Sequence, residues 1–162
     1  METTRHFVAT VYVVNDGATL LHEHETLGLW LPPGGHVDRD ELPHEAARRE
    51  AREETGLPVT ILAGEGVESP TARELPRPRH LLLEDIDVCD GRVYHQHVDH
   101  VYYATADSRA VEPAAGEAPA DAWEWVTADE LAADGRFEPD VAAFGREAIA
   151  AASRSVSDET EV

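Results

Sequence analysis

The sequence predicts an α/β fold, an α/β/α sandwich in which a mixed, curved sheet lies between two main helices. The middle of the chain consists of short segments rich in β-branched and aromatic residues and bounded by turn residues, which is typical of strands. One segment early in the chain and one late in it are instead rich in alanine and charged residues, as amphipathic helices are. Because such elements bury their apolar faces by packing in layers, we expect the sheet between the two helices.

Length and composition indicate a single domain. The chain has 162 residues, of which 42% are apolar, and this is enough for one hydrophobic core. No internal repeat or linker interrupts it. We therefore expect one domain over residues 1–154, followed by a polar, frayed tail over residues 155–162.

The first predicted elements form a hairpin. Arg5 to Val14 is rich in Val, Thr, Phe and Tyr and predicts a strand, and Asn15-Asp16-Gly17 predicts the turn into a returning strand over Ala18 to His24. Leu29 to Leu31 is a short apolar segment. Pro32 to Gly35 (Pro-Pro-Gly-Gly) follows it and predicts a turn through which no regular element passes.

The next segment predicts the first main helix. Pro43 to Thr55 is dense in Ala, Arg and Glu and contains no helix breaker after its first residue. Pro43 suits the first helical turn, and Gly56 suits the C-terminal cap.

Strands dominate the part of the chain after this helix. Val59 to Ala63 predicts a strand, and Arg79 to Asp87 and Arg92 to Thr105 predict two longer ones. Asp90-Gly91, between the two long segments, is a favourable dipeptide for a tight turn. We expect a long hairpin here.

The last third of the chain begins with a loop and ends in the second main helix. Ala106 to Pro119 is polar and contains Ala and Pro, as loops do. Ala122 to Val126 predicts a short strand, and Ala128 to Ala133 predicts one or two helical turns. Glu138 to Arg154 predicts the closing helix.

The charge balance is strongly acidic. Asp and Glu total 33 against 13 basic residues, none of which is lysine, and the formal net charge is −20. A field of this sign repels nucleic acid and anionic membranes, so we expect neither as a partner. Acidic residues from end to end, with arginine in place of every lysine, resemble the composition of proteins from halophilic archaea. In molar salt, screening over roughly 3 Å would remove the self-repulsion.

Cysteine content and the start of the chain indicate a cytoplasmic location. Cys89 is the single cysteine, so an internal disulfide is excluded, and a reducing compartment suits the chain. Met1 to Val8 has neither the basic end nor the apolar stretch of a secretory signal. No segment reaches the roughly 18 uninterrupted apolar residues of a membrane span.

Three glutamates of the first helix predict a metal site. Glu50, Glu53 and Glu54 are spaced by three and four residues, so they project from one face of a helix. Like charges so placed are costly unless a cation neutralises them. Oxygen ligands suit Mg²⁺, with Mn²⁺ as an alternative, whereas zinc would favour Cys or His. The Gly34-Gly35 segment before the helix can bring a backbone carbonyl close to the same ion.

These glutamates belong to a longer pattern that resembles the signature of the Nudix hydrolase family, the MutT-like proteins. The signature is Gly, five residues, Glu, seven residues, then Arg-Glu-apolar-any-Glu-Glu-any-Gly-apolar, and residues 35–57 match every specified position. The matching positions are Gly35, Glu41, Arg49, Glu50, Ala51, Glu53, Glu54, Gly56 and Leu57. One departure is Leu42, where many members of the family carry Ser or Thr before the helical proline; this removes a helix cap worth about 1 kcal/mol.

The resemblance implies a Nudix-type fold, a chemistry and roles for residues. It implies Mg²⁺-dependent hydrolysis of the diphosphate linkage of a nucleoside diphosphate derivative, such as a (deoxy)nucleoside triphosphate. The metal would be held by Glu50, Glu53, Glu54 and a backbone carbonyl of Gly34 or Gly35, and Arg49 would orient the carboxylates.

The resemblance implies that either a carboxylate or a metal-bound hydroxide serves as the general base. Family members often place a further glutamate before the tryptophan-bearing strand, where this chain has Glu117 and Asp121. Glu117 is our candidate for the base, and a solvated loop acid is the alternative reading. The catalytic set we expect is thus Glu53, Glu50, Arg49 and Glu117.

Substrate binding is expected from histidines and arginines. His95 and His97 alternate on one strand with Asp99 and share a face, which in the family lines the substrate cleft. Ordinary packing and a zinc site are the alternatives for this set. His36 follows the glycines and is a candidate for contact with phosphate. Two further candidates, as a phosphate clamp, are Arg77 and Arg79, and pairing with surface acids is the alternative for them.

Two other function classes stay open at this point. A noncatalytic nucleotide-binding protein of the same fold is one, although such proteins usually lose glutamates of the signature. An enzyme resembling isopentenyl diphosphate isomerase is the other, although it would need a catalytic cysteine, and Cys89 lies beside a turn. The expected partner is a small nucleotide-type molecule, and a homodimer is compatible with the sequence.

Overall fold

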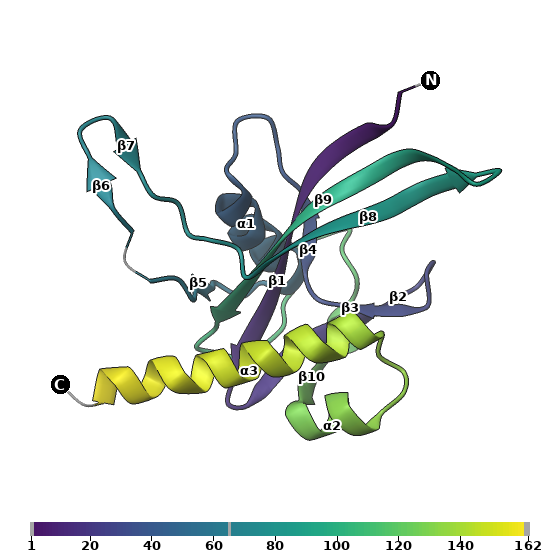
Figure 1. Ribbon diagram of the computed structural model, residues 1–162. Helices are drawn as coiled ribbons and strands as arrows, with labels where there is room; N and C mark the ends of the chain where they lie inside the picture. The colour runs from purple at the N-terminus through teal and green to yellow at the C-terminus, as the bar shows by residue number, and fades with distance from the viewer. Residues whose placement is uncertain (1, 65, 161–162) are drawn as a thin grey trace.

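The computed structural model describes residues 2–64 and 66–160, with side chains as far as residue 155. Figure 1 shows a curved sheet crossed on one face by helix α3 (Pro139–Thr160), while helix α1 (Pro43–Thr55) lies against the other face. The predicted α/β/α sandwich with a mixed sheet between two main helices is confirmed.

The sheet is built around one long strand, β1 (Thr4–Asn15). β9 (Arg92–Thr105) runs parallel to it, with Thr4 opposite His95 and Val14 opposite Thr105. β2 (Ala18–His24) returns antiparallel from β1, and β10 (Trp123–Thr127) pairs with β2. The remaining strands of this sheet are β3 (Leu29–Leu31), β4 (Gly34–His36), β5 (Thr60–Ile61) and β8 (His80–Cys89).

Strand β4 differs from the prediction. Gly34 and Gly35 pair with Thr10 and Ala9 of β1, so this segment forms a short antiparallel strand and the predicted turn is wrong. The reason is the close approach that glycine permits: a Cβ atom on Gly34 would lie 2.8 Å from the carbonyl oxygen of Ala9.

Three other segments also differ from the prediction. β5 has only two residues, because the amide of Ala63 turns back to bond to the carbonyl of Ile61 at 3.1 Å. A small hairpin of β6 (Glu68–Ser69) and β7 (Ala72–Arg73) was not predicted, since its polar residues give no alternating pattern. Helix α3 continues to Thr160, beyond the predicted end at Arg154.

Helix α1 has the predicted bounds. Pro43 begins it, and Gly56 ends it in the left-handed conformation with φ of 74°. Leu42 supplies no side-chain cap, but its amide donates to a carboxylate oxygen of Glu45 at 2.9 Å, which stabilises the helix start in a different way. The buried face of α1 consists of Ala46, Ala47 and Ala51, with His44 and Thr55 near its ends, and the small alanines let the helix approach the sheet closely.

The sheet separates two apolar cores. Alternate residues of β1 enter each of them, since successive side chains of a strand point to opposite faces. On the α1 side, Val11 and Val13 pack with the helix alanines. On the other side, Tyr12 and Val14 pack with residues of α3 and of α2 (Ala128–Ala133). In the part of the chain that the structure describes, no helix combines the length and the apolar character of a membrane span.

Candidate active site

Arg49 is the centre of a hydrogen-bonded cluster on α1. Its guanidinium forms a bidentate pair with Glu41 (Nε–Oε1 2.9 Å and Nη2–Oε2 3.0 Å). Nη1 also donates to Glu50 at 2.8 Å and to Glu53 at 3.2 Å. Nη2 donates to the backbone carbonyl of His36 at 2.9 Å, which ties the helix to the end of β4. One cation thus fixes two carboxylates of the helix against the loop that precedes it.

The electrostatics of this cluster follow from these bonds. The hydrogen bonds from Arg49 hold the pKa of the Glu41 carboxyl below its usual value, and Glu41 in turn raises the pKa of the guanidinium. Glu41 therefore stays ionised at neutral pH and keeps its ion pair with Arg49.

Two further acids at this site, Glu50 and Glu54, have raised pKa values. Burial raises the pKa of Glu54 to about 8, although the amide of Gly34 donates to its Oε1 at 3.0 Å. Burial also raises the pKa of Glu50, and the bond from Arg49 offsets only part of that rise. The charge of Glu53 adds to the rise in both pKa values, and the charge of Glu50 adds to the rise in that of Glu54. A cation beside these buried carboxylates would be favourable, because it would compensate their negative charges.

Gly35 allows β4 to approach the helix. A Cβ atom at this position would lie 2.5 Å from Cδ of Glu50 and 2.9 Å from its Oε2. Only a residue without a side chain leaves room for that carboxylate beside the strand.

Glu117 reaches the same cluster through a loop attached to the end of α1. The amide of Glu112 donates to the carbonyl of Thr55, and the amide of Ala114 donates to the carbonyl of Glu53, both at 2.8 Å. These bonds satisfy carbonyls that the last helical turn leaves free. The charge of Glu117 contributes to the raised pKa of Glu50 and of Glu54, so it lies within their electrostatic range. Asp121, the other acid considered, is exposed in a 3₁₀ turn at Ala120–Ala122.

The donors of this cluster fit a hard divalent cation, because Glu50, Glu53 and Glu54 offer only oxygen atoms. They do not converge on one point, however. Among the residues described, no group of three Asp, Glu, His or Cys side chains is arranged to hold a metal ion. Glu50 is turned toward Arg49, and Glu54 toward the amide of Gly34. A bound ion would compete with these hydrogen-bond donors for the same carboxylate oxygens.

The three histidines singled out from the sequence lie together, and a fourth joins them. The ring of His97 lies 5.1 Å from those of both His36 and His95, and His6 lies 5.4 Å from His36 and 4.6 Å from His95, measured between ring centroids. Burial first, and then the other three histidines, lower the pKa of His97. Sequence reasoning missed His6, because only the parallel register of β1 and β9 places it opposite His97.

The two arginines proposed as a phosphate clamp are engaged elsewhere. The side chain of Arg77 is 86% exposed and pairs with Glu74 at 3.1 Å. Arg79 donates to the carbonyl of Leu62 at 3.2 Å, and its guanidinium lies 5.8 Å from the ring centroid of Tyr103. The structure therefore brings the predicted histidines together and ties them to the glutamate cluster through the backbone carbonyl of His36, but it gives these two arginines other partners.

Comparison with known proteins agrees with this geometry. The NUDIX domain family matches residues 4–152. A "MutT-like protein" of Streptomyces ambofaciens is 39% identical over 66 residues, which are 41% of this chain and 43% of that protein. The alignment with this curated relative thus spans less than half of its length.

Solved structures extend the similarity over the whole fold. A hydrolase of the NUDIX family from Clostridium perfringens is 32% identical, with a TM-score of 0.77, and the match covers 90% of this chain and 97% of that one. An Ap4A hydrolase from C. elegans has a TM-score of 0.55 at 17% identity, with 96% and 99% covered, and shows likeness of fold alone. With a family match over nearly its full length and every signature position filled, the chain belongs to the Nudix hydrolase family.

Proposed function

We propose that the protein hydrolyses the diphosphate linkage of a nucleoside diphosphate derivative, such as a (deoxy)nucleoside triphosphate, with Mg²⁺ or Mn²⁺ as cofactor. The observation that carries the proposal is the Arg49 cluster. It holds Glu50 and Glu53 in fixed positions beside the glycine strand β4, next to the buried Glu54. Family membership supports hydrolysis as the reaction class.

The ion would be held by Glu50, Glu53, Glu54 and the backbone carbonyl of Gly34. When bound, it would neutralise the nonbridging oxygens of the diphosphate and make the phosphorus more electrophilic. Arg49 is a positioning residue in this scheme, because its bonds to Glu50 and Glu53 set the direction of their carboxylates.

Glu117 is the proposed general base. It would take a proton from a water molecule as the water oxygen forms a bond to phosphorus and the bridging P–O bond breaks. The electron pair of that bond leaves with the departing phosphate or nucleotide oxygen. The attachment of the loop before Glu117 to the end of α1 supports this role, because it keeps the acid near the helix glutamates.

The histidine group is proposed to contact the substrate beside the cluster. His36, His95 and His97 lie on β4 and β9 and can donate or accept hydrogen bonds on the side of the sheet that they share. Arg77 and Arg79 would have to give up their present partners to contact phosphate, so we assign them a smaller part.

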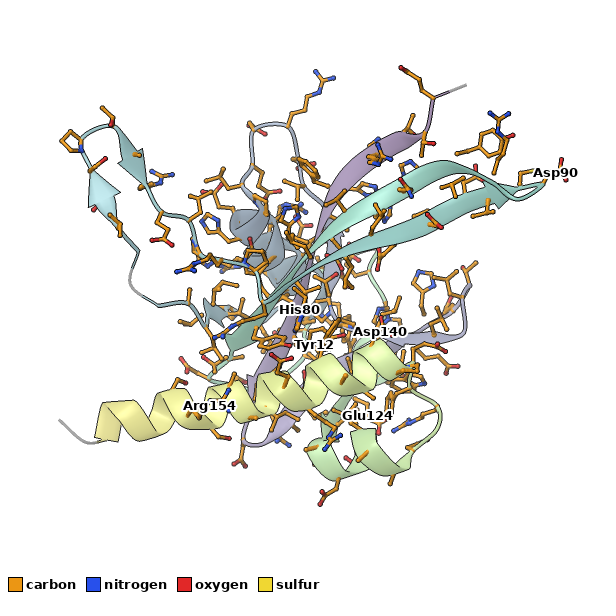
Figure 2. The ribbon with its side chains drawn as sticks, in the orientation of Figure 1. Tyr12, His80, Asp90, Glu124, Asp140 and Arg154 are labelled. Atoms are coloured by element: carbon orange, nitrogen blue, oxygen red, sulfur yellow. The ribbon has the colours of Figure 1, made fainter. Side chains whose placement is uncertain are left out.

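The competing functions fit the structure less well. A noncatalytic nucleotide-binding protein would not need Glu50 and Glu53 held in place by Arg49. An isomerase would need a cysteine at the site, whereas Cys89 is exposed beside Asp90, which Figure 2 shows at the far tip of the β8–β9 hairpin. We further propose that the enzyme works in the cytoplasm of a halophilic organism, in line with its charge of −20 and its missing lysine.

A panel of nucleotides tests the proposal. Purified protein would be incubated with nucleoside triphosphates, dinucleoside polyphosphates and sugar nucleotides in molar KCl, with Mg²⁺ and then with EDTA, and released phosphates would be separated by chromatography. We expect cleavage of at least one class that EDTA and the Glu53→Gln variant abolish. Binding without cleavage would support the noncatalytic alternative, and cleavage that survives in EDTA would contradict the metal role.

A further inference from the structure

Most of the exposed large apolar side chains lie on the β8–β9 hairpin or beside it. Of the eight that the described residues contain, four are on β8, and a fifth, Phe7, is on β1 at the other side of β9. Scattered apolar side chains are ordinary on a protein surface, but a contiguous group of them marks a contact site. The four on β8 are Leu81, Leu83, Ile86 and Val88.

Three residues on three adjacent strands form an apolar row across the sheet. Phe7 of β1 is the direct partner of Val98 of β9, and Val98 is the direct partner of Leu83 of β8. Directly paired residues point to the same face of a sheet. Leu81, two residues from Leu83, points to that face as well. We call these four residues, Phe7, Leu81, Leu83 and Val98, the apolar face.

Helix α1 lies on this side of the sheet but leaves the apolar face uncovered. Val11 and Val13 point the same way from β1, and both are fully buried in the core that contains the alanines of α1. Phe7, Leu83 and Leu81 are instead 59%, 61% and 63% exposed. Figure 1 shows the hairpin extending away from both main helices. As far as the described residues extend, this part of the sheet thus lacks the covering layer against which sheets bury an apolar surface.

A charged row lies beside the apolar row on the same face. Arg5, Gln96 and Asp85 are direct partners across the same three strands. Nε of Arg5 donates to Oε1 of Gln96 at 2.9 Å, and Nε2 of Gln96 donates to Oδ1 of Asp85 at 2.8 Å. Gln96 is buried, whereas Arg5 and Asp85 are exposed. The row therefore presents a positive charge on β1 and a negative charge on β8.

These two rows are complementary to themselves. β1 and β8 flank β9, so a two-fold axis parallel to β9 would exchange them between two copies packed face to face. In such a pair, Phe7 of each copy meets Leu83 of the other, and Val98 meets its own counterpart. Arg5 of each copy meets Asp85 of the other, so opposite charges face each other at both ends of the charged row.

We propose that two copies of this chain associate through the apolar face, with Arg5 of each copy opposite Asp85 of the other. The mixed signs of the charged row favour this occupant, since a basic partner would suit the net charge of −20 but would bring a like charge to Arg5. The inference does not depend on the proposed hydrolysis.

The proposed dimer should be weak. The apolar face and the charged row are small compared with the roughly 20–30 residues a side of a standard interface, so association should depend on protein concentration. Repulsion between two copies of this net charge should make it depend on salt as well, because screening removes that repulsion.

Sedimentation velocity over a wide range of protein concentration, at 0.1 M and at 2 M KCl, tests the proposal. We expect a monomer–dimer equilibrium that shifts toward the dimer with concentration and with salt. Leu83→Gln should raise the dissociation constant about tenfold or more, because each dimer loses two buried leucine side chains. Leu27→Gln makes the same change at a similarly exposed leucine (58%) between β2 and β3, and should leave the equilibrium unchanged.

A charge exchange tests the arrangement of the two copies. Arg5→Asp alone or Asp85→Arg alone brings like charges together, so each should weaken association at the lowest salt concentration where the parent dimerises. The double variant Arg5→Asp/Asp85→Arg puts opposite charges together again and should recover the parent equilibrium. Both positions are exposed, so folding should survive, and circular dichroism would check it. A parent that stays monomeric at every concentration and salt, association that Leu83→Gln leaves unchanged, or a double variant no better than the single ones would each overturn the proposal.

Discussion

The two acidic groups of this molecule contrast in how their charges are compensated. In the cluster on α1, Arg49 bonds to Glu41, Glu50 and Glu53, and the amide of Gly34 bonds to Glu54. The second group consists of Glu84 and Asp99, on the face of the sheet that α3 covers. Asp99 has one oxygen without a hydrogen-bond partner among the described residues, and Glu84 has only His97, at 3.9 Å. The carboxylates of the first group are held by hydrogen bonds within the chain, whereas burial is the main influence on the second group and raises the pKa of both of its acids.

The contrast bears on which group can carry out chemistry. A reacting centre needs carboxylates held in place, because small displacements of catalytic groups are costly. We therefore expect substitutions in the cluster to lower turnover for all substrates.

Removal of charge from the cluster should give the largest effect. Glu53→Gln and Glu54→Gln keep the size of each side chain, so we expect Mg²⁺-dependent turnover to fall roughly 10²–10⁴-fold, the scale of a lost catalytic group. Initial rates at saturating nucleotide would measure the loss. Glu138→Gln, an exposed acid before α3, is the matched control and should keep the parent rate. Parent turnover in Glu53→Gln or in Glu54→Gln would mean that the metal site is misassigned.

Glu117 and Asp121 allow a comparison between two acids of the loop beside the proposed active site. Glu117→Gln should lower turnover by about 10²-fold or more if Glu117 is the base, with a smaller change in KM. Asp121→Asn makes the same chemical change four residues away at an exposed position and should have little effect. Both variants would be assayed across pH, because loss of a base should flatten the limb of the rate profile that this base produces. A larger loss in Asp121→Asn than in Glu117→Gln would reverse the assignment.

The sequence predicted the proximity of the α1 glutamates far better than that of Glu84 and Asp99, for a physical reason. Glu50, Glu53 and Glu54 are neighbours because a helix brings residues three and four apart onto one face, which spacing alone shows. His6, Glu84 and Asp99 come from strands distant in the chain, and their proximity depends on the register of β1, β8 and β9. No local pattern fixes that register. The turn predicted at Gly34-Gly35 failed similarly, since pairing with β1 outweighed the local tendency of glycine to break strands.

Gly35 offers a smaller and more selective way to disturb the cluster. In Gly35→Ala, the new methyl group would overlap the carboxylate of Glu50, the flexible end of a side chain that can move aside. We expect a melting temperature close to that of the parent but a turnover reduced by about 10²-fold, the effect of displacing a catalytic group by roughly 1 Å. Gly135→Ala is the control, because no heavy atom lies within 4 Å of its added methyl. A parent rate in Gly35→Ala would show that turnover does not depend on the present position of the Glu50 carboxylate.

Salt extends the comparison from these two groups to the whole surface, where we expect the smallest effect. With 33 acids against 13 arginines, repulsion outnumbers attraction between exposed charges, so screening should stabilise the folded state. Thermal melts from 0.1 M to 3 M KCl should shift upward, by roughly 2–4 °C for each kcal/mol gained in a domain of this size. The Debye length is already about 3 Å at 1 M, so a screening effect should be concentrated below that concentration. A rise that continues evenly to 3 M would instead indicate exclusion of salt from the surface. A melting temperature that stays constant throughout would remove the halophilic interpretation, and it would leave the assignment of the Arg49 cluster intact because that assignment rests on hydrogen bonds within the cluster.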